Sequence, residues 1–491
     1  MKIIFFNSHI LWPSHYETEL ELITDLSAEG HEIIQVYCNA QLPNCDLNPF
    51  MVPEKCDSCL VKHKGGLHAL HLKIKSIPIP VLNEQDKKKI AKIPFHFSRL
   101  EELRDLKIGN FKIGMGIINS MVAITRDPSP SLKEYNPTLQ NYIISSAGIY
   151  FSFLRLLEQE KPDRVYAFSG RFAHTAAVFS ACQEKGIDCF LHERGSSLEK
   201  YSVTPNAAIT DLDFNIKAIL KKWDETDEFV RKESGSGFYK RRREGVIQNW
   251  YSFTKEQINQ LPENWNPAKR NFLIIHSSDD ELATAWHDAE PIIFSDQITG
   301  IREIVESFKD DPDIHFYLRI HPNFKSVKSP RKQELYDLNY PNLTVIPAES
   351  NISTYLLMDS SEKAISFGST AGVEAAYWGK PSVLAGNAFY RGLGSTYEPE
   401  TIEELRELIN TTLQALPIEG ALKYGFYMET FGVPFRHYQS IDITGGLFNG
   451  EKINEDPFFI QKLFRKITSL SPKLAARVRE KRVMKARSNF I

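Results

Sequence analysis

The 491-residue sequence contains no apolar run that approaches the ~20 residues needed to cross a membrane. Its net charge is only −3 at neutral pH, so it lacks the strong positive charge that is typical of nucleic-acid-binding proteins. The first residues, Met1-Lys-Ile-Ile-Phe-Phe, indicate a strand and lack the longer apolar core and the cleavage site of a signal peptide. These absences lead us to expect a cytoplasmic protein with no nucleic-acid partner.

Cysteine is scarce, with six in the whole chain, and four of the six fall within one short stretch. Cys38, Cys45, Cys56 and Cys59 follow a C-x6-C-x10-C-x2-C spacing. Disulfides are disfavoured in a reducing cytoplasm, whereas four thiols with one C-x-x-C pair can hold zinc in a tetrahedral site. The spacing matches no standard zinc ribbon. The alternatives are therefore a structural zinc site and four ordinary free thiols.

The chain is too long for one ordinary core, and its 42% hydrophobic and 25% charged residues are typical of a globular protein. Apolar strands alternate with amphipathic helices, which predicts α/β architecture with parallel strands and right-handed crossovers. We expect two Rossmann-like, doubly wound domains with a boundary near residue 265. The predicted parts are an N-terminal acceptor-side domain with a Cys-rich insertion (1–265), a nucleotide-binding domain (266–450) and a basic helical tail (451–491).

The most informative segment covers residues 366–381 and indicates a strand end, a Gly/Ser/Thr turn and the start of a helix. Such a turn presents backbone N–H groups and the Ser369 and Thr370 hydroxyls at the positive end of a helix, which favours phosphate binding. Gly372 belongs to the same turn. Glu374 lies one helical turn later, where a carboxylate can accept hydrogen bonds from ribose hydroxyls.

A second group of polar residues follows neighbouring strands upstream of this turn. Arg319 can donate bidentate hydrogen bonds to phosphate oxygens. His321 can donate a hydrogen bond to a phosphate or carry a proton. Ser277 and Ser278 follow the first strand of the second domain, and Gln297 begins the next helix. Ligands bind at the carboxyl edge of open parallel sheets, so these residues are candidate nucleotide ligands. The alternatives are a surface ion pair for Arg319 and a solvated acidic N-cap for the serine loop.

In the first domain, one strand leads into a loop with the sequence His192-Glu-Arg-Gly. Glu193 is our first candidate, and His192 the second, for a general base that takes a proton from an acceptor hydroxyl. Arg171, His174 and Arg194 are candidates for holding that acceptor. The alternative is a local salt bridge between Glu193 and Arg194 that orders the loop.

Three segments together resemble the bacterial capsule polysaccharide biosynthesis proteins: Arg319-Ile-His-Pro-Asn, residues 366–381 and His192-Glu-Arg-Gly. These proteins look like GT-B glycosyltransferases and are related in layout to the Kdo transferases of capsule export. The resemblance covers roughly residues 270–400 and, in the first domain, 160–200. It implies two Rossmann-like domains facing a cleft, with the donor nucleotide held mainly by the second. It also implies transfer without a catalytic metal, in keeping with the lack of an Asp-x-Asp motif beside the nucleotide site.

By this resemblance we expect an enzyme that moves a sugar from a nucleotide-sugar donor to a growing surface polysaccharide or glycolipid. Arg319, His321, Ser369, Thr370 and Glu374 are then the donor ligands, and no catalytic cofactor is needed. One rival is another enzyme on the same scaffold, a nucleotide-sugar epimerase or a polyol-phosphate transferase. The other is a non-catalytic subunit of a capsule assembly complex.

The end of the chain has a composition of its own. Residues 461–491 hold ten Lys and Arg and one acid, Glu480, together with a narrow apolar stripe at helical spacing. Such a segment can lie on an anionic membrane surface, which predicts peripheral contact with the inner face of the cytoplasmic membrane. The alternative is a solvated terminal helix.

Overall fold

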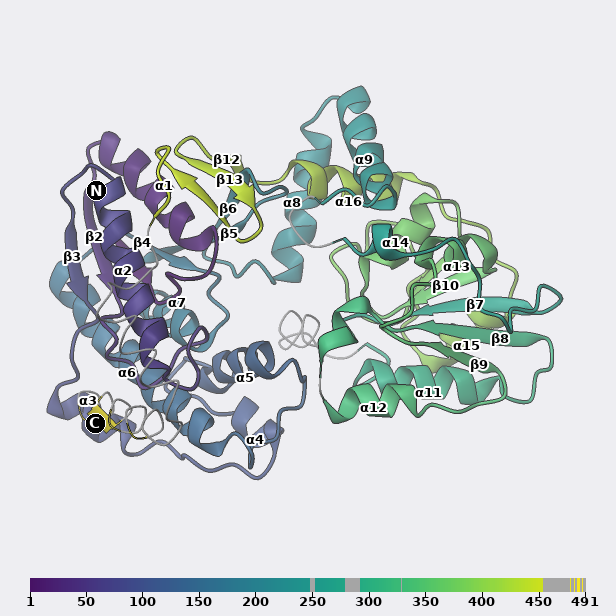
Figure 1. Ribbon diagram of the computed structural model, residues 1–491, viewed down its shortest axis with the longest axis horizontal. Helices are drawn as coiled ribbons and strands as arrows, with labels where there is room; N and C mark the ends of the chain where they lie inside the picture. Colours follow the sequence, from purple (N-terminus) through teal and green to yellow (C-terminus); the bar gives the residue numbers. More distant parts are fainter. Residues whose placement is uncertain are drawn as a thin grey trace. The chain divides into compact units, whose positions relative to one another are not determined.

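The computed structural model describes residues 1–247, 252–278, 292–327 and 329–453, together with positions 477, 481, 484, 485 and 488. Within it the chain divides into two compact units (Figure 1). Unit 1 comprises Met1–Thr125, Ser129–Ile209 and Gly432–Ile491, and unit 2 comprises Arg126–Pro128 and Thr210–Phe431. The predicted α/β class with two Rossmann-like units is confirmed by the two sheets described below. The predicted cleft between them stays a prediction.

Unit 1 is built on a seven-stranded sheet with the order β12-β6-β5-β4-β1-β2-β3. The strands from β5 to β3 are parallel, whereas β6 and β12 join the sheet antiparallel. The strands are β1 (Lys2–Asn7), β2 (Glu32–Tyr37), β3 (Lys75–Pro78), β4 (Arg164–Phe168), β5 (Asp188–Arg194), β6 (Lys200–Pro205) and β12 (Val433–Pro434). The carboxyl ends of β1, β4 and β5 therefore lie side by side at one edge.

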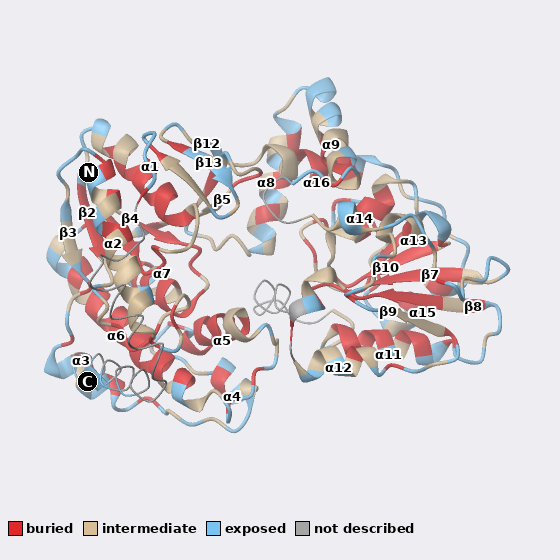
Figure 2. Cartoon of the chain, in the orientation of Figure 1, coloured by how far each residue is buried: buried red, intermediate tan, exposed pale blue. Residues whose placement is uncertain are grey.

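Helices cover both faces of this sheet. They are α1 (His15–Ala28), α2 (Pro53–Ala69), α3 (Glu84–Ile90), α4 (Leu100–Arg104), α5 (Ile113–Thr125), α6 (Asn136–Glu160) and α7 (Ala173–Lys185). Phe5 belongs to a core cluster with Tyr16 of α1, while Phe6 meets Phe153 of α6 edge-on, with ring centroids 5.7 Å apart. Because both faces are covered, β1 carries consecutive apolar residues, and the central strands β1, β2 and β4 are buried along most of their length (Figure 2).

The chain returns to unit 1 near its end, and a carboxylate of α1 holds the returning segment. The segment forms a two-stranded ladder, β13 (Tyr438–Asp442) with β14 (Gly445–Phe448). The fully buried carboxylate of Glu21 accepts the backbone N–H groups of Arg436, His437 and Tyr438 at 2.5–3.1 Å. Hydrogen bonds to a charged acceptor are the stronger kind, so Glu21 anchors residues 436–438 on the first unit.

Unit 2 contains a five-stranded sheet in the order β11-β10-β7-β8-β9, and all its neighbouring strands are parallel. The strands are β7 (Arg270–Ile275), β8 (Ile314–Arg319), β9 (Leu343–Ile346), β10 (Lys363–Ser366) and β11 (Ser382–Leu384). The described helices are α8 (Leu212–Asp224), α9 (Glu228–Arg243), α11 (Gln297–Ser307), α12 (Pro330–Tyr336), α13 (Thr354–Ser360), α14 (Thr370–Tyr377), α15 (Ile402–Asn410) and α16 (Glu419–Thr430), with 3-10 turns at Thr254–Glu256 and Pro322–Ser326.

The two faces of the second sheet bury separate cores. Phe272 and Ile274 pack with α11, α12 and α15 on one face, whereas Leu273 and Ile275 pack with α13 and α14 on the other. This arrangement of helices on both sides is the doubly wound pattern that the strand–helix alternation predicted.

The division between the units differs from the predicted boundary near 265. Residues 210–265 belong to unit 2, because α8 and α9 pack on α16. Tyr239 of α9 donates to the carbonyl of Ala421 at 2.6 Å, and a Cβ on Gly235 would lie 2.7 Å from the carbonyl of Leu422. The polar sequence of α9 conceals this close contact. Residues 432–450, which we assigned to the second domain, belong to unit 1.

None of the helices in the described ranges is long and apolar enough to cross a membrane. The basic tail over 461–491, for which we predicted membrane contact, lies almost wholly outside the described residues.

Candidate functional site

The turn between β10 and α14 forms the strand, turn and helix that the sequence predicts. Gly368 has a φ of 139°, which favours glycine, and Ser369 caps α14 by accepting the N–H of Ala371 at 3.3 Å. A Cβ on Gly372 would lie 2.6 Å from the hydroxyl of Tyr390, so this position needs glycine. The half-buried Ser369 and Thr370 therefore stand at the N-terminus of α14.

Glu374 has partners within unit 2, and its predicted role as a ribose ligand stays a prediction. Its buried carboxylate accepts Nε of Arg242 at 2.8 Å on one oxygen and the hydroxyl of Tyr355 on the other. The Nη2 of Arg242 also donates to Oγ1 of Thr370 at 3.2 Å. Burial acts against the charge of Arg242, but the nearby Glu374 outweighs it and raises the pKa of Arg242 above its usual value. Glu374 thus holds a cation beside the helix N-terminus.

Arg242 is a residue that the sequence analysis missed as part of this site. Its side chain is 38% exposed, although its partner Glu374 is buried. It lies within the run Lys240-Arg-Arg-Arg243 at the end of α9. The signal available in the sequence was the cluster of three arginines, but nothing local indicates which of them reaches α14.

Arg319 lies at the carboxyl end of β8, but its contacts differ from the predicted phosphate contact. Its Nη1 donates to the carbonyl of Pro347 at 2.6 Å and its Nη2 to the carbonyl of Ser350 at 2.9 Å. The side chain is buried, and burial lowers its pKa to about 10. Arg319 therefore fixes the loop after β9, and this structural role replaces the surface ion pair that we considered as the alternative.

His321 follows β8 and begins the 3-10 turn at Pro322–Ser326. Its Nδ1 accepts the backbone N–H of Asn323 at 3.2 Å, and its own backbone N–H donates to Nδ1 of His276 at 3.5 Å. Because Nδ1 is an acceptor, the neutral imidazole carries its proton on Nε2. His321 is partly exposed at this edge of the sheet.

Gln297 and the serine loop after β7 are joined by two reciprocal hydrogen bonds. The Oε1 of Gln297 accepts the N–H of Ser277 at 3.0 Å, and its Nε2 donates to the carbonyl of Ser277 at 3.1 Å. Both side chains are buried, and so is Ser278. Gln297 thus shapes the loop from inside the fold. The acidic continuation of this loop, from residue 279, lies outside the described residues.

In unit 1, Glu193 lies near the end of β5, and the side chain that it faces is His15. The Oε2 of Glu193 is 3.9 Å from Nε2 of His15, which begins α1. Burial raises the pKa of Glu193, and the charge of Arg171 offsets only part of this effect. His15 was not among the predicted site residues, because no local pattern connects it with Glu193.

Arg194 is the last residue of β5, and its guanidinium contacts other segments of unit 1. Its guanidinium donates to Oγ of Ser14 at 3.2 Å, to the carbonyl of Pro13 at 3.3 Å and to the carbonyl of Ile443 at 3.2 Å. These contacts tie the end of β5 to the segment before α1 and to the β13–β14 turn. Arg194 thus has a structural role in unit 1.

His192 and His174 are both buried and neutral. Burial, together with the charge of His9, lowers the pKa of His192 to about 3, and neither of its ring nitrogens has a hydrogen-bond partner among the described residues. Burial lowers the pKa of His174 to about 4, and its Nε2 contacts Oγ of Ser145 at 2.9 Å. His174, fully buried, is therefore corrected from an acceptor ligand to a core histidine.

Aromatic side chains line the same edge of the first sheet. Phe168 lies at its centre, with the ring centroid of His15 at 4.1 Å, of His9 at 5.1 Å and of Trp12 at 5.5 Å. Arg171, predicted to hold the acceptor, places its guanidinium 4.7 Å from the ring centre of Phe172. Charge and aromatic surface thus occur together around Glu193, and Trp12 is partly exposed.

The four clustered cysteines are free thiols of intermediate exposure. Within the described part of the chain, no group of three or more His, Cys, Asp or Glu side chains is arranged to hold a metal ion. Burial is the main cause that raises the pKa of Cys38 to about 11, and the nearby Cys56 adds to it. The four thiols as placed do not form the predicted metal site, and structural zinc stays a prediction.

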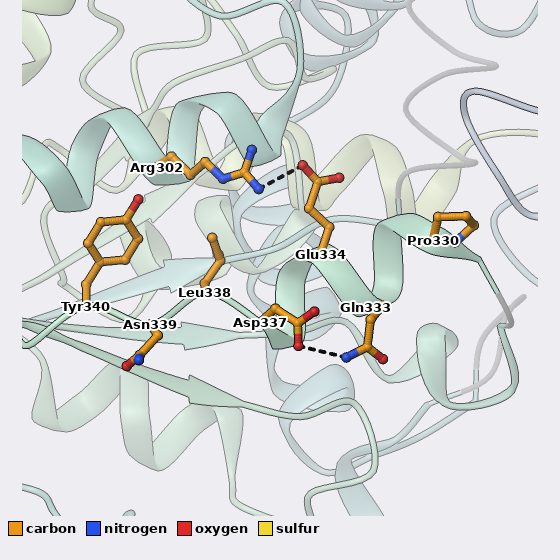
Figure 3. A pocket seen from close by; sticks show the side chains of 8 residues that line it. All are labelled: Arg302, Pro330, Gln333, Glu334, Asp337, Leu338, Asn339 and Tyr340. Atoms are coloured by element: carbon orange, nitrogen blue, oxygen red, sulfur yellow. Dashed lines mark hydrogen bonds and ion pairs between the residues drawn. The ribbon is translucent and has the colours of Figure 1, made fainter.

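A pocket in unit 2 lies away from these edges. It is an open pocket of about 770 Å³ between α11, α12 and the segment before β9 (Figure 3). An ion pair between Arg302 and Glu334, at 2.8 Å, and a hydrogen bond from Gln333 to Asp337, at 2.7 Å, satisfy much of its polar lining. None of the predicted site residues lines it.

The fold is thus that of an α/β protein with two Rossmann-like units, each with polar residues at a carboxyl sheet edge. Residues 243–427 match the model of the family described as capsule polysaccharide biosynthesis protein, and the predicted resemblance is confirmed. That segment contains β8, β10 and the turn into α14. No curated protein matches the chain.

Solved structures provide weaker likenesses. The chain is similar to KpsC, beta Kdo 2,4 transferase, of Thermosulfurimonas dismutans, with 14% identity over 54% of this chain and 79% of that chain, at a TM-score of 0.39. The chain is also similar to KpsC, beta Kdo 2,7 transferase, of the same organism. The identity is 13% over 62% of this chain and 88% of that chain, at a TM-score of 0.35. For CalG4, the calicheamicin glycosyltransferase, the identity is 13% over 87% of this chain and 94% of that chain, at a TM-score of 0.25. These scores are low, and the fold assignment rests on the sheet topology of this chain.

Proposed function

We propose that the protein is a glycosyltransferase that moves a sugar from a nucleotide-sugar donor to a growing capsular or other surface polysaccharide, or to a glycolipid. The observation that carries the proposal is the family match over 243–427, which contains the Gly/Ser/Thr turn at the start of α14. The α14 N-terminus, with Arg242 beside Thr370, has the charge that a phosphate needs.

In the proposed reaction, unit 2 binds the donor through the backbone and hydroxyls of Ser369 and Thr370, through Arg242 and through His321. The acceptor hydroxyl oxygen forms a bond with the anomeric carbon of the sugar. The bond from that carbon to the phosphate oxygen breaks, and the nucleotide leaves with the electron pair. Glu193 takes the proton of the acceptor hydroxyl as general base, a role for which a raised pKa is suitable.

The donor site is tested by nucleotide binding. We expect one of CMP, CDP, UMP, UDP, GDP and ADP to raise the Tm of the full chain, because a ligand of the native state stabilises it by mass action. The His321→Ala variant is expected to lose this shift. The control is His315→Ala, because His315 lies at the other end of β8 and contacts Oγ1 of Thr344 at 2.8 Å. No shift with any nucleotide, or an equal shift in both variants, contradicts the proposed donor site.

A further inference from the structure

His15 and Glu193 come together from distant parts of the sequence at one edge of the first sheet. His15 begins α1 shortly after β1, and Glu193 is the last residue but one of β5. Since β1 and β5 flank β4, their carboxyl ends are neighbours. The Nε2 of His15 and the Oε2 of Glu193 are 3.9 Å apart, with side chains only 6% and 15% exposed. A hydrogen bond between these two atoms would require them to approach to about 3.2 Å or less.

His15 also contacts aromatic rings and the imidazole of His192. Its Nδ1 has no hydrogen-bond partner among the residues that the structure describes. Its ring lies against Phe168, with centroids 4.1 Å apart, and meets Trp12 edge-on at 5.9 Å. Among the described residues, Glu193 provides the carboxylate beside Nε2 of His15.

Burial and the titratable groups around the pair determine its protonation. Those facing it are His9 from the segment after β1, Arg171 from the loop after β4, and His192 and Arg194 from β5. Burial, followed by these groups, holds the pKa of His15 well below its usual value, so the imidazole is neutral near pH 7. A neutral imidazole can donate one hydrogen bond to a carboxylate without transferring a full charge to it.

We propose that His15 is a positioning residue for Glu193: its Nε2–H donates to the carboxylate and orients it toward the acceptor hydroxyl. This inference rests on the proposed function, in which Glu193 takes the acceptor proton. The proton goes from the acceptor oxygen to Glu193 and not to His15. A carboxylate held in one rotamer by such a donor meets the geometric demand on a general base, which must lie within hydrogen-bond reach of the proton.

The pairing can be measured without any substrate. Nitrogen NMR of the full chain labelled in histidine distinguishes the two neutral tautomers, and the signal of His15 is identified by its loss in His15→Gln. We expect the Nε2–H tautomer in the wild type and a changed tautomer ratio in Glu193→Leu. The Nδ1–H tautomer in the wild type, or an unchanged ratio in Glu193→Leu, overturns the inference.

The functional role is measured by nucleotide release from CMP-, UDP- and GDP-activated sugars, with methyl glycosides as acceptors. We expect His15→Phe to lower kcat at least about tenfold and to move the acid limb of kcat/KM to higher pH, because a carboxylate that loses a donor binds its proton more tightly. His15→Gln keeps a donor and is expected to retain most of the activity. KM for the donor is expected to stay unchanged in both.

His63→Gln is the matched control, because His63 is another buried histidine of unit 1 and its Nε2 contacts Oγ of Ser76 at 3.4 Å. We expect it to leave the acid limb in place. If His15→Gln loses as much kcat as His15→Phe, His15 itself takes the proton and the inference is wrong. If the wild type releases no nucleotide, the proposed function fails, while the tautomer measurement still decides the pairing.

Discussion

The Nε of Arg242 lies 2.8 Å from Oε1 of Glu374, and this pair joins the end of α9 to the first turns of α14. The contact puts a guanidinium beside Thr370 at the helix N-terminus, where an anion would bind. Glu374 is itself buried, so the pair supplies a cation to a carboxylate that has little contact with solvent. The donor site that we propose is therefore built partly by a helix that precedes the matched family region.

We expect Arg242→Gln to lower the free energy of unfolding by about 2–3 kcal/mol, because it leaves the buried carboxylate of Glu374 without its cation. The measurement is urea denaturation at neutral pH. The control is Arg241→Gln, since Arg241 pairs with the partly exposed Glu429 and its loss should cost less than about 1 kcal/mol. Equal losses in the two variants contradict a special role for Arg242.

Glu19 predicts a pH dependence of stability. Burial raises the pKa of this α1 carboxyl to about 7, although Gln35 and Asn7 donate hydrogen bonds to it. The folded state thus binds the proton more tightly than the unfolded state, so this contribution to stability is full below about pH 4.5 and is lost as the pH rises to about 7. A shift of this size corresponds to roughly 3 kcal/mol.

In Glu19→Gln this contribution should vanish, so the unfolding free energy is expected to fall less between pH 5 and pH 7.5 than in the wild type. The measurement is urea denaturation across this pH range. A difference between the two proteins that does not vary with pH contradicts the account.

Glu21 predicts how firmly the returning segment is held. Glu21→Ala leaves the backbone N–H groups of residues 436–438 without this acceptor, which should cost about 2–4 kcal/mol. We expect faster proteolytic cleavage near these residues, read out by mass spectrometry of the fragments. The exposed Glu29 at the end of the same helix provides the control, and Glu29→Ala should behave as the wild type. Unchanged cleavage in Glu21→Ala would mean that other contacts hold the segment.

Local sequence signals predicted the elements of the second sheet and the turn into α14. The turn could be predicted because Gly368, Ser369 and Gly372 each satisfy a local demand of backbone geometry or close packing. The partners of Glu374 could not, because Arg242 comes from a separate helix and the side of α14 that is buried depends on tertiary packing. The rule that ligands bind at the carboxyl ends of parallel strands directed attention to Arg319 at the end of β8. It could not predict that the guanidinium donates hydrogen bonds to two backbone carbonyls.

The first unit shows the same limit. Glu193 was recognised from its place at a strand end, whereas His15 meets it only because β1 and β5 share β4 as a neighbour. The predicted boundary near 265 separated α9 from the second domain. In the structure α9 belongs to unit 2, because Gly235 and the buried Tyr239 pack on α16. Such long-range matches are not visible in composition or in periodicity.

The most direct test of the proposed function is sugar transfer itself. The wild type and Glu193→Gln are incubated with CMP-, UDP- and GDP-activated sugars and a saccharide acceptor, and nucleotide release and the mass of the acceptor are followed together. We expect the wild type to add one sugar for each nucleotide released and Glu193→Gln to be about 10²–10⁴-fold slower, the usual effect of losing a general base. Nucleotide binding without transfer in the wild type, or equal rates in the two proteins, would contradict the account.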